Sequence, residues 1–248
     1  MVPHSHNNMA PVLSFHNISK RYGKSMALDH ASLNIEPGEI FGLVGANGAG
    51  KTTLIKCLLD FCEPDSGTIE IFGIDHHATN SRLDLAYLPE SFIPPYYLTG
   101  KDFLQYMLKL QGLDYNQAES LKMLEELDLD PTALTKPVRT YSKGMTQKLG
   151  LAGCFLRKRN LYILDEPMSG LDPKARVLLK RRILNSRDEG ATLFFTSHAL
   201  SDVEALCNRM AILHDGQIRF CGTPEECRAT YSATTLENAY LACINSLE

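Results

Sequence analysis

Apolar and polar residues alternate along much of the N-terminal third of the chain, which is the pattern of half-buried β-strands. Pro37-Gly38 interrupts the alternation with a turn signal, and Asp65-Ser66-Gly67 does the same before the last alternating segment. The pattern therefore predicts strands over residues 12–15, 31–35, 40–44 and 68–72.

From about residue 99 the period lengthens to that of an α-helix. Three groups of apolar residues each lie on one helical face, and Asp114 is a candidate N-cap before the second group. No strand pattern interrupts them, so residues 99–157 are expected to form a helical insertion. The three groups are Phe103, Leu104, Met107, Leu108 and Leu110; Leu121, Leu124 and Leu127; and Met145, Leu149, Ala152 and Leu156.

Strand patterns return over residues 161–164, 192–196 and 210–214. Asp172-Pro173 provides a helix N-cap followed by proline, and residues 214–217 form a hairpin signal before a strand over 218–220. Strands that alternate with helices predict a largely parallel sheet covered on both faces. The early hairpins predict an additional antiparallel sheet.

Composition fits one large α/β domain or two small ones and narrows the classes of function. The chain has 248 residues, of which 44% are hydrophobic and 22% charged, with 25 basic and 29 acidic side chains. These values exclude disorder over most of the chain and argue against a strongly basic nucleic-acid-binding protein. The longest uncharged apolar stretch, residues 149–156, is too short for a membrane-spanning helix, which needs roughly 20 residues.

The seven cysteines lack a CxxC pair, so a structural zinc site is not expected and most of the thiols should be buried. Residues 1–10 are polar, lack the apolar core of a secretory signal and are expected to be disordered. His4 and His6 in that segment are at most fortuitous metal donors. These features favour a protein of the reducing cytoplasm.

Three further histidines, His76, His77 and His214, fall in turn-like segments and are expected to face solvent. Two short basic runs, residues 157–159 and 180–182, are expected to be exposed helix faces. A membrane-surface contact is the alternative interpretation of these runs.

Residues 45–52 match G-x-x-x-x-G-K-[ST], the pattern of a phosphate-binding loop between a strand and a helix. Glycines let successive N–H groups face one concavity, to which the helix adds the positive end of its dipole. Lys51 is placed to reach the β- and γ-phosphates, and Thr52 to offer its hydroxyl to Mg²⁺. An ordinary glycine-rich turn with a solvated lysine is the alternative. The predicted nucleotide-binding residues are Gly45, Ala46, Asn47, Gly48, Ala49, Gly50, Lys51, Thr52 and Thr53.

Two adjacent acids, Asp165 and Glu166, follow the apolar strand predicted at residues 161–164. Ligands of open α/β sheets gather at the carboxyl ends of the strands. Asp165 is therefore predicted to hold Mg²⁺, directly or through water, and Glu166 to orient or deprotonate the attacking water. An exposed acidic turn is the alternative.

In this order the motifs resemble those of the ATP-binding cassette (ABC) ATPases, the motor subunits of ABC transporters, over about residues 13–223. The resemblance implies the α/β fold of P-loop NTPases in its ABC-ATPase form. That fold has a mostly parallel core sheet, an N-terminal antiparallel β subdomain and an inserted α-helical subdomain. One domain would cover residues 11–223, with the core and antiparallel part in 11–90 and 158–223 and the helical subdomain in 91–157. Residues 224–248 would form a short helical tail.

The resemblance also assigns roles to single residues. Tyr22 stands where the family has an aromatic residue that stacks on adenine. Glu90 stands where the family usually has the glutamine of its Q-loop, with a surface glutamate as the alternative. His198 matches the H-switch and is expected to contact the γ-phosphate. The implied catalytic residues are Lys51, Glu90, Glu166 and His198, and the implied Mg²⁺ ligands are Thr52, Glu90 and Asp165.

Residues 141–145 occupy the position of the family signature, usually Leu-Ser-Gly-Gly-Gln, and match it at Ser142 and Gly144. The resemblance implies that these two residues bind the nucleotide of an opposing subunit, whereas a plain helix N-cap is the alternative for Ser142. Residues 169–172 resemble the D-loop, which is a contact between subunits. The chain has one copy of each motif, so the resemblance implies a dimer with a second ATP-binding subunit, identical or similar.

The implied function is to bind ATP and Mg²⁺, dimerise on ATP and drive a separately encoded membrane-spanning subunit from the inner face of the cell membrane. Residues 92–98 are unusually apolar and aromatic and are expected to line the groove that docks this partner, with local packing as the alternative. Residues 38–43 and 236–241 resemble the ABC-2-type exporters, which favours export. Two alternatives are a soluble ABC ATPase acting on ribosomes or nucleic acid and a phosphate-loop protein outside the ABC family. No nucleic-acid partner is expected.

Overall fold

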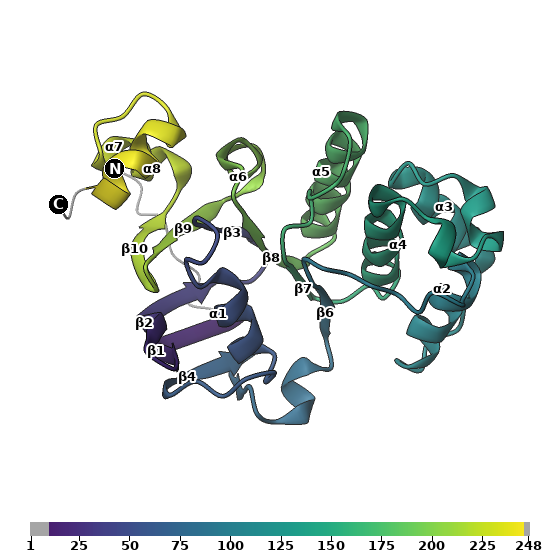
Figure 1. Cartoon of the computed structure of the whole chain (residues 1–248), viewed down its shortest axis with the longest axis horizontal. Coiled ribbons are helices and arrows are strands. Elements are labelled where there is room, and N and C mark those ends of the chain that lie inside the picture. Colours follow the sequence, from purple (N-terminus) through teal and green to yellow (C-terminus); the bar gives the residue numbers. More distant parts are fainter. Residues whose placement is uncertain (1–9, 246–248) are drawn as a thin grey trace.

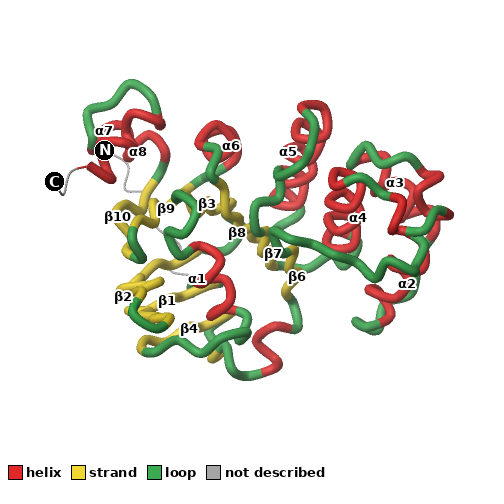
Figure 2. The backbone as a smooth tube through the Cα atoms, in the orientation of Figure 1, coloured by secondary structure: helices red, strands yellow, loops and turns green. Residues whose placement is uncertain are grey.

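The structure is a computed structural model that describes residues 10–245, with two sheets in contact and a group of helices at one end (Figure 1). The tube in Figure 2 shows strands concentrated on one side of the molecule and a bundle of helices on the other. The predicted fold class is confirmed: a mostly parallel sheet is accompanied by an antiparallel sheet and a helical insertion. The segment predicted to be disordered includes His4 and His6. Apart from Ala10, it lies outside the described residues.

One sheet is antiparallel and has four strands in the order β2-β1-β4-β5. The other has six strands in the order β10-β9-β3-β8-β7-β6, and all neighbours in it are parallel except β9 and β10. The antiparallel strands are β1 (Leu13–Tyr22), β2 (Ser25–Ile35), β4 (Ser66–Ile71) and β5 (Ile74–Asp75). The strands of the larger sheet are β3 (Ile40–Val44), β6 (Leu85–Leu88), β7 (Leu161–Leu164), β8 (Thr192–Ser197), β9 (Arg209–His214) and β10 (Gln217–Gly222).

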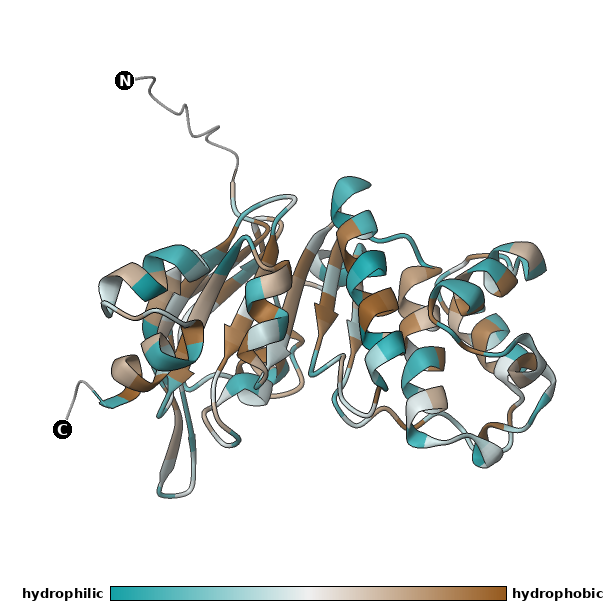
Figure 3. Ribbon diagram, turned by 90° about the horizontal axis from the view of Figure 1, so that it is seen from above, coloured by the Kyte–Doolittle hydropathy of each residue, from teal (hydrophilic) through white to brown (hydrophobic). Residues whose placement is uncertain are grey.

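The three central strands β3, β7 and β8 are buried at every residue. A parallel sheet that is covered on both faces requires such continuous apolar runs, and Figure 3 shows hydrophobic strands at the centre of the molecule. β6 was not predicted from the sequence. It pairs with β7 along its whole length and places Pro89 and Glu90 directly after the sheet edge.

Eight α-helices and three short 3₁₀ helices complete the described part of the chain. The α-helices are α1 (Lys51–Leu58), α2 (Gly100–Lys109), α3 (Gln117–Glu126), α4 (Lys143–Phe155), α5 (Pro173–Asp188), α6 (Leu200–Leu206), α7 (Pro224–Thr230) and α8 (Leu236–Asn245). The 3₁₀ helices are η1 (Thr79–Arg82), η2 (Pro131–Thr135) and η3 (Val138–Thr140). In this part of the chain, no helix is both long and apolar enough to span a membrane.

The helical insertion α2–α4 follows the predicted apolar faces, with two errors at the helix ends. Asp114 is not a cap, because Asn116 begins α3 and accepts hydrogen bonds from the N–H groups of Ala118 and Glu119 at 2.9 and 3.2 Å. Leu110 is not in the core: it is the C-cap of α2 and is 64% exposed, since it lies on the opposite side of the helix from Leu108. Local period identifies a helix well but not where it ends.

Some polar residues that were expected to be exposed are buried. His76 begins the turn after β5 and is only 2% exposed, and burial lowers the pKa of its imidazole. Arg157 is buried at the end of α4, and Arg182 forms ion pairs with Glu126 and Glu189 at 3.4 and 2.7 Å. Four cysteines are buried as expected, whereas the others are partly or fully exposed; the buried four are Cys57, Cys154, Cys227 and Cys243.

Phe194 links the two sheets at the centre of the core. Its ring on β8 lies 6.4 Å from that of Phe15 on β1 and 6.2 Å from that of Phe41 on β3, and all three side chains are fully buried. The same hydrophobic cluster includes Leu54 and Ile55 of α1. The helix that follows the phosphate loop is therefore anchored between the sheets.

Phe194→Ala should lower the free energy of unfolding by about 3–5 kcal/mol, because it removes a ring and leaves a cavity between the sheets. Urea denaturation followed by circular dichroism measures this change. The matched control is Val177→Ala, which truncates an apolar side chain that is 59% exposed on α5 and should change stability by less than about 0.5 kcal/mol. A similar cost for the two variants would contradict the assigned role of Phe194.

Candidate active site

The loop of residues 45–52 joins β3 to α1 and packs closely against neighbouring backbone. A Cβ at Gly45 would lie 2.4 Å from the carbonyl oxygen of Leu213, and one at Gly50 would lie 2.4 Å from that of Ala27. Gly50 also has a φ of 112°, which a side chain would strain. Gly50 is the N-cap of α1 and provides no side-chain cap, so the first N–H groups of the helix remain available to an anion.

Lys51 is buried at the start of α1 and is held by its own loop. Its Nζ donates to the carbonyl oxygens of Gly45 and Ala46 at 2.6 and 3.3 Å and lies 3.7 Å from Oε1 of Glu166. The ammonium group is thus fixed between the loop and the acid that follows β7. This arrangement fits a lysine that binds phosphate oxygens entering the loop.

Asp165 accepts hydrogen bonds from two threonines of different elements. The Thr52 hydroxyl donates to its Oδ2 at 3.1 Å, and the Thr196 hydroxyl donates to its Oδ1 at 2.6 Å. Burial raises the pKa of Asp165 above its ordinary value, against the two hydroxyl hydrogen bonds, which lower it. A carboxylate beside a threonine hydroxyl is the oxygen donor set that Mg²⁺ prefers, so Thr52 and Asp165 fit the metal role predicted for them.

The backbone of Glu166 is strained, and its side chain lies between Lys51 and His198. Its φ of 49° lies in the left-handed region, and its N–H donates to the Thr196 hydroxyl at 2.9 Å. Its Oε2 lies 2.9 Å from Nδ1 of His198, whereas its Oε1 is buried without a hydrogen-bond partner. A buried carboxylate oxygen with no partner is positioned to accept a hydrogen bond from a bound water.

A cleft of about 230 Å³ opens beside the loop, and most of the predicted phosphate-site residues line it. Gly45, Ala49, Asp165 and His198 do not line the cleft. Gly45 is in close contact with Ala49 within the loop, Asp165 accepts a hydrogen bond from Thr52, and His198 pairs with Glu166. The lining residues are Ala27, Ala46, Asn47, Gly48, Gly50, Lys51, Thr52, Thr53, Glu90 and Glu166. Thr196 joins Asp165 to Glu166 through its hydroxyl, and the sequence analysis did not predict this role. Its position at the end of a strand, just before Ser197-His198, could have indicated it.

Tyr22, Ser142 and Gly144 do not line this cleft. Tyr22 ends β1 with its ring 48% exposed, and its hydroxyl donates to Sγ of Cys62 at 3.5 Å. Ser142 is the N-cap of α4 and accepts from the N–H of Met145 at 3.2 Å. The cap is therefore present, and the two signature residues lie outside the phosphate cleft of their own chain.

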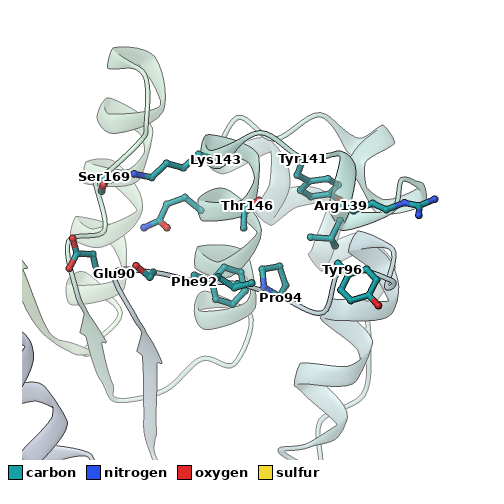
Figure 4. A pocket seen from close by; sticks show the side chains of 13 residues that line it. Glu90, Phe92, Pro94, Tyr96, Arg139, Tyr141, Lys143, Thr146 and Ser169 are labelled. Atoms are coloured by element: carbon teal, nitrogen blue, oxygen red, sulfur yellow. Dashed lines mark hydrogen bonds between the residues drawn. The ribbon is translucent and has the colours of Figure 1, made fainter.

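A second cleft, of about 470 Å³, lies between the end of β6 and the helical insertion (Figure 4). Glu90 lines both this cleft and the first one. On its upper rim in Figure 4, Lys143 extends toward Ser169, and its Nζ lies 3.5 Å from the Ser169 hydroxyl. Half-buried Phe92 and exposed Tyr96 of the 92–98 segment also line it.

The chain matches the family model described as ABC transporter over residues 28–169. It is 39% identical over 206 residues to an uncharacterized ABC transporter ATP-binding protein of Synechocystis, covering 82% of this chain and 58% of that protein. It is 35% identical to the bacitracin transport ATP-binding protein of Bacillus licheniformis (85% of this chain, 69% of that protein). It is 34% identical to the Nod factor export ATP-binding protein I of Burkholderia thailandensis (88% and 72%).

A solved structure of the ATP-binding subunit of an ABC transporter superposes with a TM-score of 0.85 at 31% identity, covering 94% of this chain and 99% of that one. The fold and the phosphate loop define a P-loop nucleotide-binding protein of the ABC type. The chain belongs to the ABC transporter family, as an ATP-binding domain of that family. It spans 58% of the length of the Synechocystis relative and 62% of that of an uncharacterized ABC transporter ATP-binding protein of Nostoc, to which it is 39% identical.

Asp165→Asn should stabilise the nucleotide-free and metal-free protein increasingly as pH rises. The pKa of Asp165 is raised in the folded protein, so ionising its carboxyl costs folding free energy once the pH passes the ordinary value of 3.8, and asparagine avoids that cost. The measurement is the free energy of unfolding of both proteins from about pH 4 to about pH 8. The control is Asp114→Asn at an exposed loop carboxylate. A variant-to-parent difference for Asp165→Asn that does not change with pH would contradict the prediction.

Proposed function

We propose that this chain is an ATP-driven motor subunit of an ABC transporter, which binds and hydrolyses MgATP. The observation that carries the proposal is one connected group of side chains from distant parts of the sequence. Lys51, Thr52 and Glu166 line the cleft. Asp165 accepts a hydrogen bond from Thr52, and His198 lies 2.9 Å from Glu166. The family of the chain supports ATP as the ligand.

The residues of the cleft divide the work of binding. The uncapped N–H groups of α1 and the Lys51 ammonium bind the phosphates, and Thr52, Asp165 and Glu90 hold Mg²⁺, which neutralises phosphate charge when bound. Tyr22 offers an exposed ring face on which adenine can stack.

Glu166 is the residue that orients the attacking water and takes its proton. Its Oε1 has no hydrogen-bond partner in the described structure, and Lys51 and Thr196 fix the carboxylate and its backbone. His198 contacts the other carboxylate oxygen at 2.9 Å and is itself largely exposed. It is placed to contact the γ-phosphate and to report its presence to Glu166.

Dimerisation completes the site. Ser142 and Gly144 lie at the N-terminal end of α4, outside the cleft of their own chain. A second ATP-binding subunit, identical or similar, would bring this helix end against the γ-phosphate, where N–H groups favour an anion. Lys143, which is exposed beside it, would add a positive charge.

Glu166→Gln should retain MgATP binding and lower the rate of phosphate release by about 100-fold or more, because glutamine cannot take the proton of water. Phosphate release under steady-state conditions and binding of a fluorescent ATP analogue measure the two properties. The control Glu125→Gln changes an exposed glutamate on α3 and should hydrolyse ATP at the parental rate. Normal hydrolysis by Glu166→Gln would remove Glu166 from this role.

The partner of the motor is a separately encoded membrane-spanning subunit, to which the chain binds at the inner face of the cell membrane. The second cleft and the residue beside it offer the docking surface. Ile93 and Tyr96 line the cleft and Tyr97 follows them in the chain; they are 87%, 69% and 71% exposed, which is unusual for large apolar side chains. The name of the Nod factor export relative favours export, and that of the bacitracin relative supports transport. The ribosomal or nucleic-acid alternative gains no support from these relatives.

Tyr96→Glu with Tyr97→Glu should abolish co-purification with the membrane subunit while leaving basal ATP hydrolysis intact, because two charges would be buried in an apolar contact. Affinity purification from detergent-solubilised membranes, with mass spectrometry of the co-purified proteins, measures the first property, and phosphate release measures the second. Tyr106→Glu, at a half-exposed tyrosine of α2 outside the cleft, is the control.

Two results would contradict the docking proposal. Loss of folding in the double variant, seen by circular dichroism, would show that the segment only packs locally. Co-purification of ribosomes or nucleic acid with the parental chain, in the absence of any integral membrane protein, would favour the soluble alternative.

A further inference from the structure

Three side chains outside the proposed active site meet at the far end of the phosphate-loop helix. Asp60 follows α1, and His76 and His77 follow β5. Each offers one ligand atom, and these three atoms all lie within 4.8 Å of one another. Neither nucleotide binding nor docking, as described above, uses them.

His76 has a buried ring nitrogen with no partner. The residue is 2% exposed, and its Nδ1 lies 3.2 Å from the carbonyl oxygen of Ile69. A carbonyl oxygen only accepts, so Nδ1 carries the proton and the lone pair is on Nε2. Nε2 is buried and makes no hydrogen bond in the described structure. A histidine whose first nitrogen is bound to a backbone carbonyl and whose second is unpaired is arranged like a metal ligand.

Asp60 and His77 have the separation that two ligands of one metal ion need. Oδ1 of Asp60 lies 3.2 Å from Nδ1 of His77. Ligands about 2.0–2.1 Å from a tetrahedral zinc ion are about 3.3 Å apart. The ring of His77 lies against that of His76, with 3.9 Å between the centroids.

Two neighbouring side chains orient these ligands. Nδ1 of His77 donates to Oδ1 of Asp60 at 3.2 Å, so a bound ion would replace the proton on this nitrogen. Glu63 Oε1 lies 3.5 Å from Nε2 of His77, where it can accept the proton that Nε2 then carries. Arg82 lies 3.7 Å from Oδ2 of Asp60, so the other oxygen, Oδ1, is left for a cation. The guanidinium charge of Arg82 opposes a cation, and we expect an affinity below that of closed structural zinc sites.

We propose that Asp60, His76 and His77 bind a divalent transition-metal ion of the zinc type. Two imidazoles with one carboxylate suit Zn²⁺, Co²⁺ or Ni²⁺ and not Mg²⁺, which prefers oxygen ligands. The bound ion joins the C-terminal end of α1 to the turn after β5 and stabilises the folded chain by mass action. The site is independent of the proposed ATPase function.

Zinc binding is tested on the full chain carrying His4→Ala and His6→Ala, which removes the competing histidines of the N-terminal segment. Millimolar Mg²⁺ saturates the oxygen sites of the nucleotide cleft. Competition with a chromogenic chelator measures Zn²⁺ affinity and stoichiometry, and the visible spectrum of added Co²⁺ reports the ligand geometry. We expect one equivalent of Zn²⁺ and a tetrahedral Co²⁺ spectrum.

His77→Ala and Asp60→Asn, in the same background, should each weaken Zn²⁺ binding by about tenfold or more. Asparagine tolerates the left-handed backbone of Asp60, whose φ is 61°, so this variant should keep the fold. The matched control is His30→Ala: His30 is exposed on β2 and pairs with Asp29 at 2.7 Å, and no third ligand joins them among the described residues. It should bind Zn²⁺ like its parent.

The proposal fails if the background chain takes up no stoichiometric Zn²⁺. It also fails if both variants bind Zn²⁺ as tightly as their parent, or if His30→Ala weakens binding equally. ATP hydrolysis is not a readout in this experiment, so neither result depends on the proposed function.

Discussion

The order of the parallel strands is the constraint on which the active site depends. β8 lies between β3 and β7, and parallel strands all end at the same edge of the sheet. The loop after β3, the acids after β7 and His198 after β8 therefore meet, although 113 residues separate Thr52 from Asp165. Thr196 uses one hydroxyl to join them: it donates to Asp165 and accepts from the backbone of Glu166.

The site is built at a cost in stability. Lys51, Asp165 and Glu166 are all buried, the pKa of Asp165 is raised by that burial, and Glu166 has a left-handed backbone. Buried charges and backbone strain each destabilise a fold unless other interactions offset them. The packing of Phe194 with Phe15 and Phe41 between the sheets is one of the interactions that offset this cost. Bound phosphate and Mg²⁺ would supply the partners that these groups lack.

Glu90 connects the chemistry to the surface proposed for docking, because it lines both clefts. The chain continues from it into Phe92, which packs tightly against the insertion. A Cβ on Gly150 of α4 would lie 2.8 Å from Phe92 and 2.7 Å from Leu88. Glu90 is therefore joined to α4 over a few residues by close-packed contacts.

The sequence by itself determined the features that depend on neighbouring residues: the strand–loop–helix of residues 40–58, the acids after β7 and the apolar faces of the insertion. Only the tertiary structure decided the strand β6, the link through Thr196, the burial of His76 and the exposure of Leu110. It also decided that Ser142 and Tyr22 lie outside the phosphate cleft. The physical reason is that period, caps and turns act over a few residues, whereas burial and hydrogen-bond partners are set by which distant segments pack together.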